Sequence, residues 1–401
     1  LRCFHSLSPL AEKAHVRRMV HETLTGRLKQ EAQRQGFELV GVCPAVAPAG
    51  LSRLRDWLDA GYAGEMSYLP QRLAAYEHPR SILDGVRSLL MLGMNYRTAE
   101  PSPPARSAGR VSRYAWGTAD YHDLIHGRLK QLSRYLSDQI PGARIRGVVD
   151  TAPLLEREFA QLAGLGWIGK NTLLINQQLG SWFFLAALLT DQELEYDAQQ
   201  AANHCGTCRA CLDACPTRAF PEPYVLDANR CLSYLTIELR GAISPDLRTA
   251  VGERVFGCDV CQEVCPWNRR APVGTEPAFA PAPGMNPLPL EELFFWHEAR
   301  FRERFRRTPL WRSKRRGLLR NAAIVLGNQH SIASLEALIC GLHDAEPVVR
   351  AACVWALRQF DELPAAQALR ECLNVEHDPD VRAEILLAEN ASSKIQSPSA
   401  G

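Results

Sequence analysis

The sequence carries, at residues 205–216, the stretch CGTCRACLDACP. Its cysteines follow the spacing C-x2-C-x2-C-x3-C-P, which bacterial ferredoxins use to bind a 4Fe-4S cubane. Three thiolates spaced in this way can wrap one face of a cube, whereas the fourth, which precedes a proline, turns away from it. In two-cluster proteins the fourth cysteine binds the other cluster. The stretch therefore predicts a module with two iron–sulfur clusters.

A second stretch, CDVCQEVCP at residues 258–266, supplies most of the remaining ligands. It lacks a first cysteine, because Val255 stands where that cysteine would be. Two cubanes need eight thiolates, the two stretches hold seven, and Cys231 is the one other cysteine between them. We therefore assign one cluster to Cys205, Cys208, Cys211 and Cys265, and the other to Cys215, Cys231, Cys258 and Cys261.

Two other uses of cysteine fit these stretches less well. Disulfide frameworks are typical of short secreted chains, and this chain has 401 residues. Structural zinc sites use cysteine pairs rather than a triplet followed by C-x3-C-P, although zinc is the main alternative interpretation. Because iron–sulfur clusters carry single electrons, the module predicts a redox protein with an external electron donor.

The composition is that of an ordinary globular protein. Hydrophobic residues make up 46% of the chain, charged residues 22%, and the net charge is +2. No apolar run is long enough to span a membrane, and the first residues lack a signal-peptide pattern. The remaining cysteines are scattered and odd in number, which favours free thiols in a reducing cytoplasm. We expect a cytoplasmic monomer with no membrane contact. These remaining cysteines are Cys3, Cys43, Cys340, Cys353 and Cys372.

Residues 21–195 predict an α/β or α+β domain, because strand and helix patterns alternate along them. Residues 88–96 form a continuous apolar run, as in a strand buried on both faces. Pro153 is expected at the first position of a helix that follows a strand over 145–149. Further helices are expected over 22–36, 52–60 and 121–138, and further strands over 37–43, 172–175 and 182–189.

The rest of the chain divides by composition. We expect an unassigned segment over 1–20, a ferredoxin-like double-cluster module over 196–270, a Pro-rich linker over 271–299, a basic helical domain over 300–390 and a disordered tail over 391–401. The helical domain carries a weak repeat, in which LRNA at residue 319 recurs as VRAA at 349 and VRAE at 381. This pattern is typical of HEAT-like all-α arrays, which usually bind macromolecules.

A dense positive charge opens the helical domain. Residues 300–320 hold ten basic side chains against the single acid Glu303, with aromatic residues between them. Like charges at helical spacing repel each other, and a polyanion such as nucleic acid would relieve that repulsion. The alternative interpretation is a solvated helix face. The candidates for nucleic-acid contact are Arg312, Lys314, Arg315, Arg316 and Arg320.

Short motifs stand along the chain in addition to the cysteine spacing. They are AWG at 115–117, DYHD at 120–123, VDT at 149–151, GKN at 169–171, DACPT at 213–217, RCLS at 230–233 and GCDVC at 257–261. Together with the order of an N-terminal domain, a double-cluster module and a basic HEAT-like tail, these motifs resemble the epoxyqueuosine reductase family. The resemblance covers residues 22–385, whereas ferredoxins share the cysteine stretches alone and are far shorter.

The resemblance implies a specific reaction. Members of this family reduce the epoxide of epoxyqueuosine to give queuosine, at the wobble base of tRNAs with GUN anticodons, which accept Asp, Asn, His and Tyr. The reduction takes two electrons and two protons and releases water. Electrons pass through two 4Fe-4S clusters to a cobalamin that lies between the N-terminal domain and the clusters. The sequence has no D-x-H-x-x-G corrinoid motif, so cobalamin is implied by the resemblance alone.

By the same resemblance, Asp150 matches the family's proton donor. An epoxide oxygen leaves only as an alcohol, so the reaction needs a general acid, which contributes about 10²–10⁴-fold. An acid at neutral pH needs a raised pKa, and we therefore expect Asp150 in a partly desolvated pocket. The alternative role is an N-cap for the helix expected at Pro153. His122 is either a second proton-handling group or an ordinary surface histidine.

The resemblance also suggests contacts to the cofactors. Lys170 and Asn171 follow a glycine-rich segment and could approach corrinoid amides, although an ordinary tight turn would have the same sequence. The full set of expected cofactor contacts is Ser112, Asp150, Lys170, Asn171, Leu174, Ile175, Asn176, Ser233, Asp259 and Val260.

Two rival functions differ in the features that they need. A corrinoid iron–sulfur reductase of small molecules, such as a reductive dehalogenase, would need neither the basic stretch nor the helical array. A simple electron carrier or scaffold would not need a large domain in front of the clusters, with Asp150 at a strand end. The sequence thus favours a tRNA-modifying oxidoreductase.

Overall fold

The computed structural model describes residues 23–200 and 202–393. Its N-terminal part is built on a four-stranded sheet with the order β1-β2-β7-β4, in which every neighbouring pair is antiparallel. The fold of this part is therefore α+β rather than a parallel α/β sheet. The strands are β1 (Leu39–Pro44), β2 (Ser88–Asn95), β4 (Ile145–Val148) and β7 (Phe183–Thr190).

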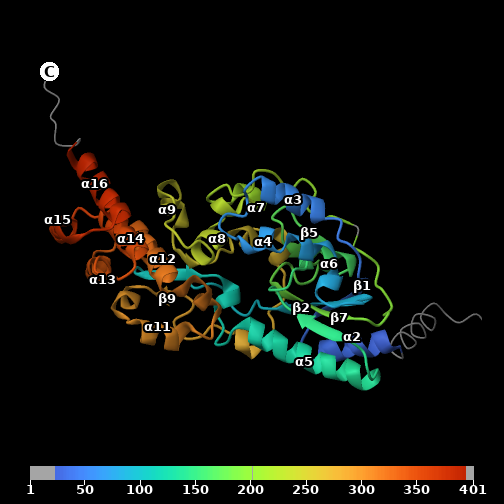
Figure 1. Cartoon of the computed structure of the whole chain (residues 1–401). Coiled ribbons are helices and arrows are strands. Elements are labelled where there is room, and N and C mark those ends of the chain that lie inside the picture. Colours follow the sequence, from blue (N-terminus) through green and yellow to red (C-terminus); the bar gives the residue numbers. More distant parts are fainter. Residues whose placement is uncertain (1–22, 201, 394–401) are drawn as a thin grey trace, which may run out of the picture.

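Helices cover both faces of this sheet (Figure 1). Strand β2 is buried along its whole length, as the continuous apolar run predicts. Its alternate side chains enter two separate cores, so Leu90 packs toward α2 (Leu24–Arg34) and α5 (Tyr121–Gln139), whereas Leu89 packs toward α6 (Glu156–Leu162). The sheet thus fixes the end of β4 and the start of α5 beside each other.

The expected helix start at Pro153 is wrong. Helix α6 begins at Glu156, and its N-cap is Leu155, which makes no side-chain bond. Asp150 therefore caps no helix, and a loop over residues 149–155, here called the Asp150 loop, separates β4 from α6. The helices α3 (Leu51–Asp59) and α4 (Tyr68–Gln71) precede β2.

The cluster module consists of short helices that begin within or beside the cysteine stretches. Helix α7 (Ala210–Asp213) lies in the first stretch and α10 (Val260–Glu263) in the second. Between them lie α8 (Leu232–Ile237) and α9 (Pro245–Val251). The hairpin β5 (Trp167–Ile168) and β6 (Leu174–Ile175) leads from the N-terminal part towards this module.

A second sheet joins three parts that the sequence separates. Its order is β8-β3-β9, with β3 (Ala108–Val111) from the N-terminal part, β8 (Arg254–Phe256) from the cluster module and β9 (Leu288–Pro289) from the expected linker. The segment 271–299 is therefore packed rather than an open linker, and Phe279, Met285 and Leu288 are almost fully buried.

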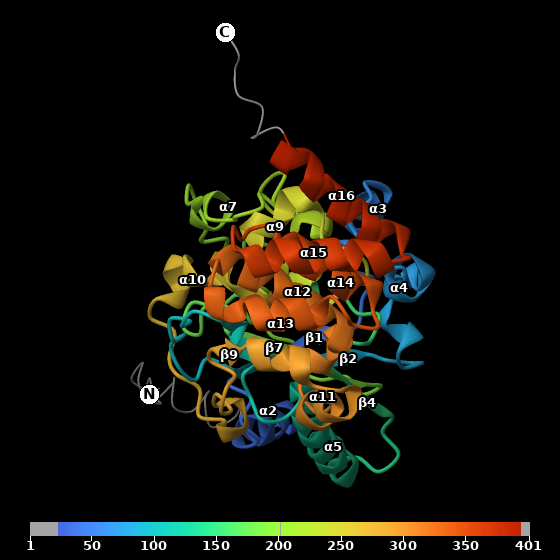
Figure 2. The same ribbon diagram turned by 90° about the vertical axis from the view of Figure 1, so that its left-hand side faces the viewer.

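The C-terminal part is an array of packed helices, seen face-on in Figure 2. Helix α16 continues into the expected disordered tail, so residues 391–393 are helical, while residues 394–401 and the segment 1–20 lie outside the described residues. No helix in the described part of the chain is long and apolar enough to cross a membrane. The helices are α11 (Glu298–Phe305), α12 (Lys314–Gln329), α13 (Leu335–Gly341), α14 (Pro347–Leu357), α15 (Leu363–Val375) and α16 (Pro379–Ser393).

Short 3-10 helices connect these elements. They are η1 (Leu73–Glu77), η2 (Pro79–Ser81), η3 (Arg113–Ala115), η4 (Ala228–Arg230), η5 (Pro266–Asn268), η6 (Pro277–Phe279), η7 (Glu291–Phe295), η8 (Pro309–Ser313) and η9 (Ile332–Ser334). The basic stretch is divided among α11, η8 and the start of α12, so it does not form one continuous helix.

Candidate active site

Asp150 lies just after β4, where its carboxylate meets the first turn of α5. The Tyr121 hydroxyl donates a hydrogen bond to Asp150 Oδ2, and His122 Nε2 lies 3.3 Å from the same oxygen. About half of the Asp150 side chain, 48%, is open to solvent. The sequence thus brings together its two predicted proton-handling residues, Asp150 and His122, from separate elements.

A second carboxylate completes a chain of three groups. Asp120 is the N-cap of α5 and accepts the backbone N–H of His122 at 3.0 Å. Its Oδ1 also lies 2.6 Å from His122 Nδ1. Burial alone would lower the pKa of His122, but hydrogen bonds to Asp120 and Asp150 raise it to about 9. The imidazole is therefore protonated at neutral pH.

The expected rise in the pKa of Asp150 is wrong for this structure. Burial would raise that pKa, but the hydrogen bonds from His122 and Tyr121 and the charges of His122 and Arg312 hold it below its usual range. Asp150 is consequently a carboxylate paired with an imidazolium. The acidic proton of the site resides on His122, one hydrogen bond away from Asp150.

Three desolvated groups lie near this pair. Burial raises the pKa of Tyr114, raises that of Glu156 to about 7 and lowers that of Arg157, yet all three residues keep some access to solvent. Tyr114 also senses the charges of Asp259 and Asp150, so it lies between the proton-handling groups and the second cysteine stretch.

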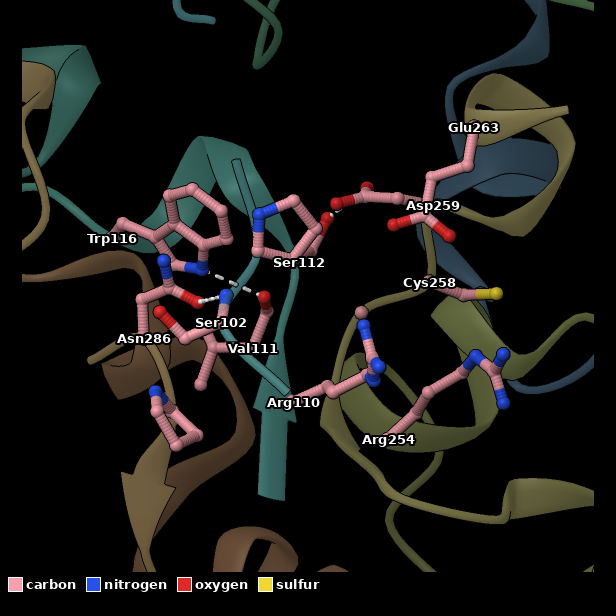
Figure 3. Close-up of a pocket in the computed structure, with 13 residues that line it drawn as sticks. Ser102, Arg110, Val111, Ser112, Trp116, Arg254, Cys258, Asp259, Glu263 and Asn286 are labelled. Carbon is pink, nitrogen blue, oxygen red and sulfur yellow. Dashed lines mark hydrogen bonds between the residues drawn. The ribbon is translucent and has the colours of Figure 1, made fainter. Parts of the chain in front are cut away.

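Ser112 and Asp259 form one edge of the cluster module. The Ser112 hydroxyl and the backbone N–H of Arg113, the latter at 2.8 Å, both donate to the Asp259 carboxylate. Burial still raises the pKa of Asp259 to about 6. Figure 3 shows Ser112 and Asp259 beside Cys258 and Arg254, on the lining of a small pocket.

Other expected cofactor contacts lie at the joint between the N-terminal part and the cluster module. Lys170 Nζ donates to the carbonyl oxygens of Gly206 and Cys208 at 2.7 and 2.9 Å, and Asn171 Nδ2 lies 3.5 Å from the carbonyl of Cys261. The structure thus gives both side chains a role that the sequence analysis missed, in holding the cysteine stretches. Asn176 Nδ2 bonds the Leu165 carbonyl at 2.7 Å, and Leu174 and Ile175 are buried in the short hairpin.

The thiols of the two cysteine stretches and of Cys231 lie near one another. The Cys211 thiol feels the charges of Cys265, Cys205 and Cys208, and Cys231 feels that of Cys215. Cys261 feels the charges of Cys258 and Cys231 but also that of Cys211, so the division into two ligand sets stays a prediction. Within the described residues, no three metal-binding side chains converge as they would on a single ion. A cubane differs from that case, because each thiolate binds a different iron and the sulfurs stand apart.

Backbone donors point at the sulfurs, as iron–sulfur proteins require. The Ala219 N–H lies 3.3 Å from Cys215 Sγ. Burial raises the pKa of Cys231 and raises that of Cys258 to about 12, but backbone hydrogen bonds from Ser233 and Val260 act in the opposite direction on these thiols. The residues present therefore fit two clusters, and Ser233 and Val260 contact the cluster thiols through their main chains.

The basic stretch is less available than its sequence suggests. Arg320 is only 1% exposed and donates to the carbonyls of Leu235, Leu239 and Gly241. It joins α12 to the cluster module, so its expected contact with nucleic acid is wrong. Arg315 is 17% exposed and pairs with Asp344 at 2.7 Å.

The accessible cations line a hollow between η8, α12 and the turn before α14. Arg302 and Lys314 lie over the ring of Trp311, at 5.9 and 4.4 Å from its centre. Arg316 lines the same hollow and is 41% exposed. Arg312 lies apart from it, in a bidentate pair with Glu238 in which both distances are 2.8 Å.

Three comparisons with known proteins agree with this geometry. Residues 77–151 match the family described as "Epoxyqueuosine reductase QueG, DUF1730". Residues 204–268 match a 4Fe-4S double cluster binding domain, and residues 310–388 match HEAT repeats. These matches confirm the predicted fold of the cluster module and of the C-terminal array.

Relatives extend the match to most of the chain. The epoxyqueuosine reductase of Pseudomonas aeruginosa is 43% identical over 345 residues, which are 84% of this chain and 95% of the relative. The enzyme of Escherichia coli K12 is 38% identical over 340 residues, 84% of this chain and 89% of the relative.

Solved structures agree as well. A crystal structure of epoxyqueuosine reductase with an epoxyqueuosine-modified tRNA-Tyr stem loop is 29% identical, with a TM-score of 0.85, and the match covers 92% of this chain and 98% of that one. A structure of the Bacillus subtilis enzyme, with its catalytic loop swung out of the active site, is 28% identical with a TM-score of 0.84 and the same coverage. This chain is an oxidoreductase that belongs to the epoxyqueuosine reductase family.

Proposed function

We propose that this protein reduces epoxyqueuosine to queuosine at the wobble base of tRNAs with GUN anticodons, those for Asp, Asn, His and Tyr. The observation that carries the proposal is the chain of Asp120, His122 and Asp150, beside the desolvated Tyr114, which also senses the charge of Asp259 in the cluster module. A relative of similar fold binds a tRNA-Tyr stem loop that carries the substrate.

Two 4Fe-4S clusters on the two predicted sets of thiols would carry electrons from an external donor toward these groups. A cobalamin bound between the N-terminal part and the clusters would supply the two-electron reduction of the epoxide. Tyr114 and Arg157, together with Ser112 and Asp259, are the residues in place to bind such a large and amide-rich group.

The protein's own contribution is the handling of protons. His122 holds a proton at neutral pH, and its Nε2 faces Asp150 Oδ2 at 3.3 Å. Asp150 is open enough to reach a substrate oxygen, and it passes the proton to that oxygen as the C–O bond breaks. Asp120 keeps the imidazole oriented and stabilises its charge. A second proton completes the release of water.

The hollow around Trp311 is the surface that we propose for the tRNA backbone. Arg302, Lys314 and Arg316 present positive charge there, and an aromatic ring with cations over it can also stack on a base. We also propose that the protein acts as a monomer in the cytoplasm, where a reducing environment would keep the cysteines outside the cluster module, Cys43, Cys340, Cys353 and Cys372, as free thiols.

A direct assay tests the reaction. The protein is reconstituted with iron–sulfur clusters and cobalamin and is incubated, with a chemical one-electron reductant, with a tRNA stem loop that carries epoxyqueuosine. The masses of the nucleosides are then measured by mass spectrometry. We expect the loss of one oxygen atom from the modified base. If the base is unchanged while a small organohalide is reduced by the same preparation, the alternative of a dehalogenase-like enzyme replaces this proposal.

A further inference from the structure

Glu156 is the first residue of α6, and its carboxylate folds back over the Asp150 loop. Its Oε1 accepts the backbone N–H of Asp150 at 2.8 Å. The neighbouring acid in the same turn, Glu158, reaches away from this loop and accepts the backbone N–H of Gly50 at 2.9 Å. Glu156 therefore serves the Asp150 loop, and its neighbour provides a natural comparison.

Asp150 needs an anchor because its backbone has a left-handed conformation, with φ of +52°. Residues with a Cβ atom rarely adopt this region, since it crowds the carbonyl oxygen. The next amide, of Thr151, bonds back to the Val149 carbonyl at 2.6 Å, so the chain turns sharply at Asp150. This turn aims the carboxylate at Tyr121 and His122, and it would relax if nothing held the amide.

The other contacts of the loop do not hold Asp150 itself. Arg72 Nη1 donates to the carbonyl of Thr151 at 3.1 Å from an exposed position, and the Leu154 N–H bonds the Ala152 carbonyl at 2.8 Å. Within the described residues, Glu156 is the one partner of the Asp150 amide. Glu156 is thus the one side chain that holds the backbone amide of Asp150, while the bond from Thr151 to Val149 closes the turn and Tyr121 contacts the carboxylate.

The charges around Glu156 affect the strength of this bond. Burial raises the pKa of Glu156 to about 7, the charge of Asp150 adds to the rise, and Arg157 and His122 oppose it. Both protonation states keep an oxygen that can accept the amide hydrogen. The ionised state accepts it more strongly, because hydrogen bonds to charged groups are the stronger kind.

We propose that Glu156 is a positioning residue that holds the backbone of Asp150 in its turned conformation and so keeps the carboxylate beside His122. The proposal rests on the proposed role of Asp150 as proton donor. It assigns to Glu156 no contact with the reacting atoms.

Hydrogen exchange of the protein without added substrate tests the anchor directly. The amides of residues 150–151 are followed in wild type, Glu156→Ala, Glu156→Gln and the control Glu158→Ala. We expect the Asp150 amide to exchange at least about tenfold faster in Glu156→Ala, because this amide has lost its acceptor. In Glu156→Gln, which keeps an acceptor oxygen, we expect exchange near that of wild type. If Glu156→Ala does not fold, Glu156→Asp, which is one methylene shorter, takes its place.

Turnover of the epoxyqueuosine stem loop gives the second readout. We expect kcat to fall by about tenfold to a hundredfold in Glu156→Ala, with unchanged affinity for tRNA, and to recover in Glu156→Gln. Unchanged exchange in Glu156→Ala would overturn the proposal. Faster exchange with normal turnover would leave the anchor in place and instead contradict the role of Asp150 as proton donor.

Discussion

At the scale of single residues, the location of one proton decides how the site can work. His122 is an imidazolium with a carboxylate on either side, and the pKa of Asp150 is held down by the same contact that raises that of His122. An acid with a depressed pKa cannot store a proton at neutral pH. Asp150 can still deliver one, if His122 supplies it as the oxygen of the substrate becomes basic.

The His122 contacts predict a pH-dependent contribution to stability. Folding raises the pKa of His122 from 6.5 to about 9. The contribution of protonated His122 to stability is therefore fully present below pH 6.5 and is lost as the pH rises to about 9. Wild type should therefore melt a few degrees above His122→Gln at pH 6, and this difference should shrink by pH 9.5. Thermal unfolding of both proteins at several pH values measures it, and a constant difference would contradict the raised pKa.

The sequence could single out Asp150 and His122 but not their protonation. The VDT and DYHD motifs mark both residues, and the tyrosine that hydrogen-bonds Asp150 lies within DYHD itself. The depressed pKa of Asp150 depends on the start of α5 meeting the end of β4, which no local pattern shows. The role of Glu156 is hidden for a similar reason, because it requires the left-handed turn at Asp150.

At the scale of elements, α12 shows why a charged stretch can mislead. The helix is buried from Gly317 to Gly327, and Arg320 lies in its middle. The sequence shows the charge of the stretch but not which side of the helix faces a neighbour. Burial lowers the pKa of Arg320 only to about 10, so the side chain stays charged and bonds the carbonyls of the cluster module.

Loss of Arg320 should therefore weaken the fold. Arg320→Ala leaves the carbonyls of Leu235, Leu239 and Gly241 without a donor, and we expect a loss of about 3 kcal/mol or more in the free energy of unfolding. Denaturant unfolding of Arg320→Ala and of the accessible control Arg316→Ala measures it. A stable Arg320→Ala protein with weakened tRNA affinity would restore the rejected contact.

The cysteine stretches belong to the same scale, and here spacing alone predicts the grouping of the thiols. Cys231 is expected to complete the second cluster. Cys231→Ala should lower the iron content by up to one cluster, about four irons, and leave the signal of the other cubane. Iron analysis and electron paramagnetic resonance measure both, and full iron loading of this variant would remove Cys231 from the ligand set.

At the scale of the whole molecule, the three-stranded sheet joins the N-terminal part, the cluster module and the segment that leads into the helical array. The division by composition misses this, because β3 and β9 are short and their partners lie far along the chain. The hollow around Trp311 and the proton-handling groups are consequently held in fixed relation. A tRNA bound in the hollow would, on this proposal, present its wobble base to Asp150.

Salt dependence tests that arrangement. If Arg302 and Lys314 neutralise phosphates, tRNA affinity should fall steeply as the salt concentration rises. The double variant Arg302→Glu, Lys314→Glu should reduce the slope of log affinity against log salt concentration by about one to two units. A matched control reverses Lys130 and Arg134, which are exposed on α5. Affinities of the three proteins for one tRNA at several salt concentrations decide the matter. Equal slopes would exclude the hollow as the binding surface.

The most direct test of the account is single-turnover reduction of an epoxyqueuosine stem loop by wild type and by Asp150→Asn. The substitution keeps the side-chain shape and the amide that bonds Glu156, but it removes the group that passes the proton. We predict that the rate of queuosine formation, followed by mass spectrometry, falls by about 10²-fold or more while tRNA affinity is unchanged. A variant that reduces the epoxide at nearly the wild-type rate would show that Asp150 is not the proton donor.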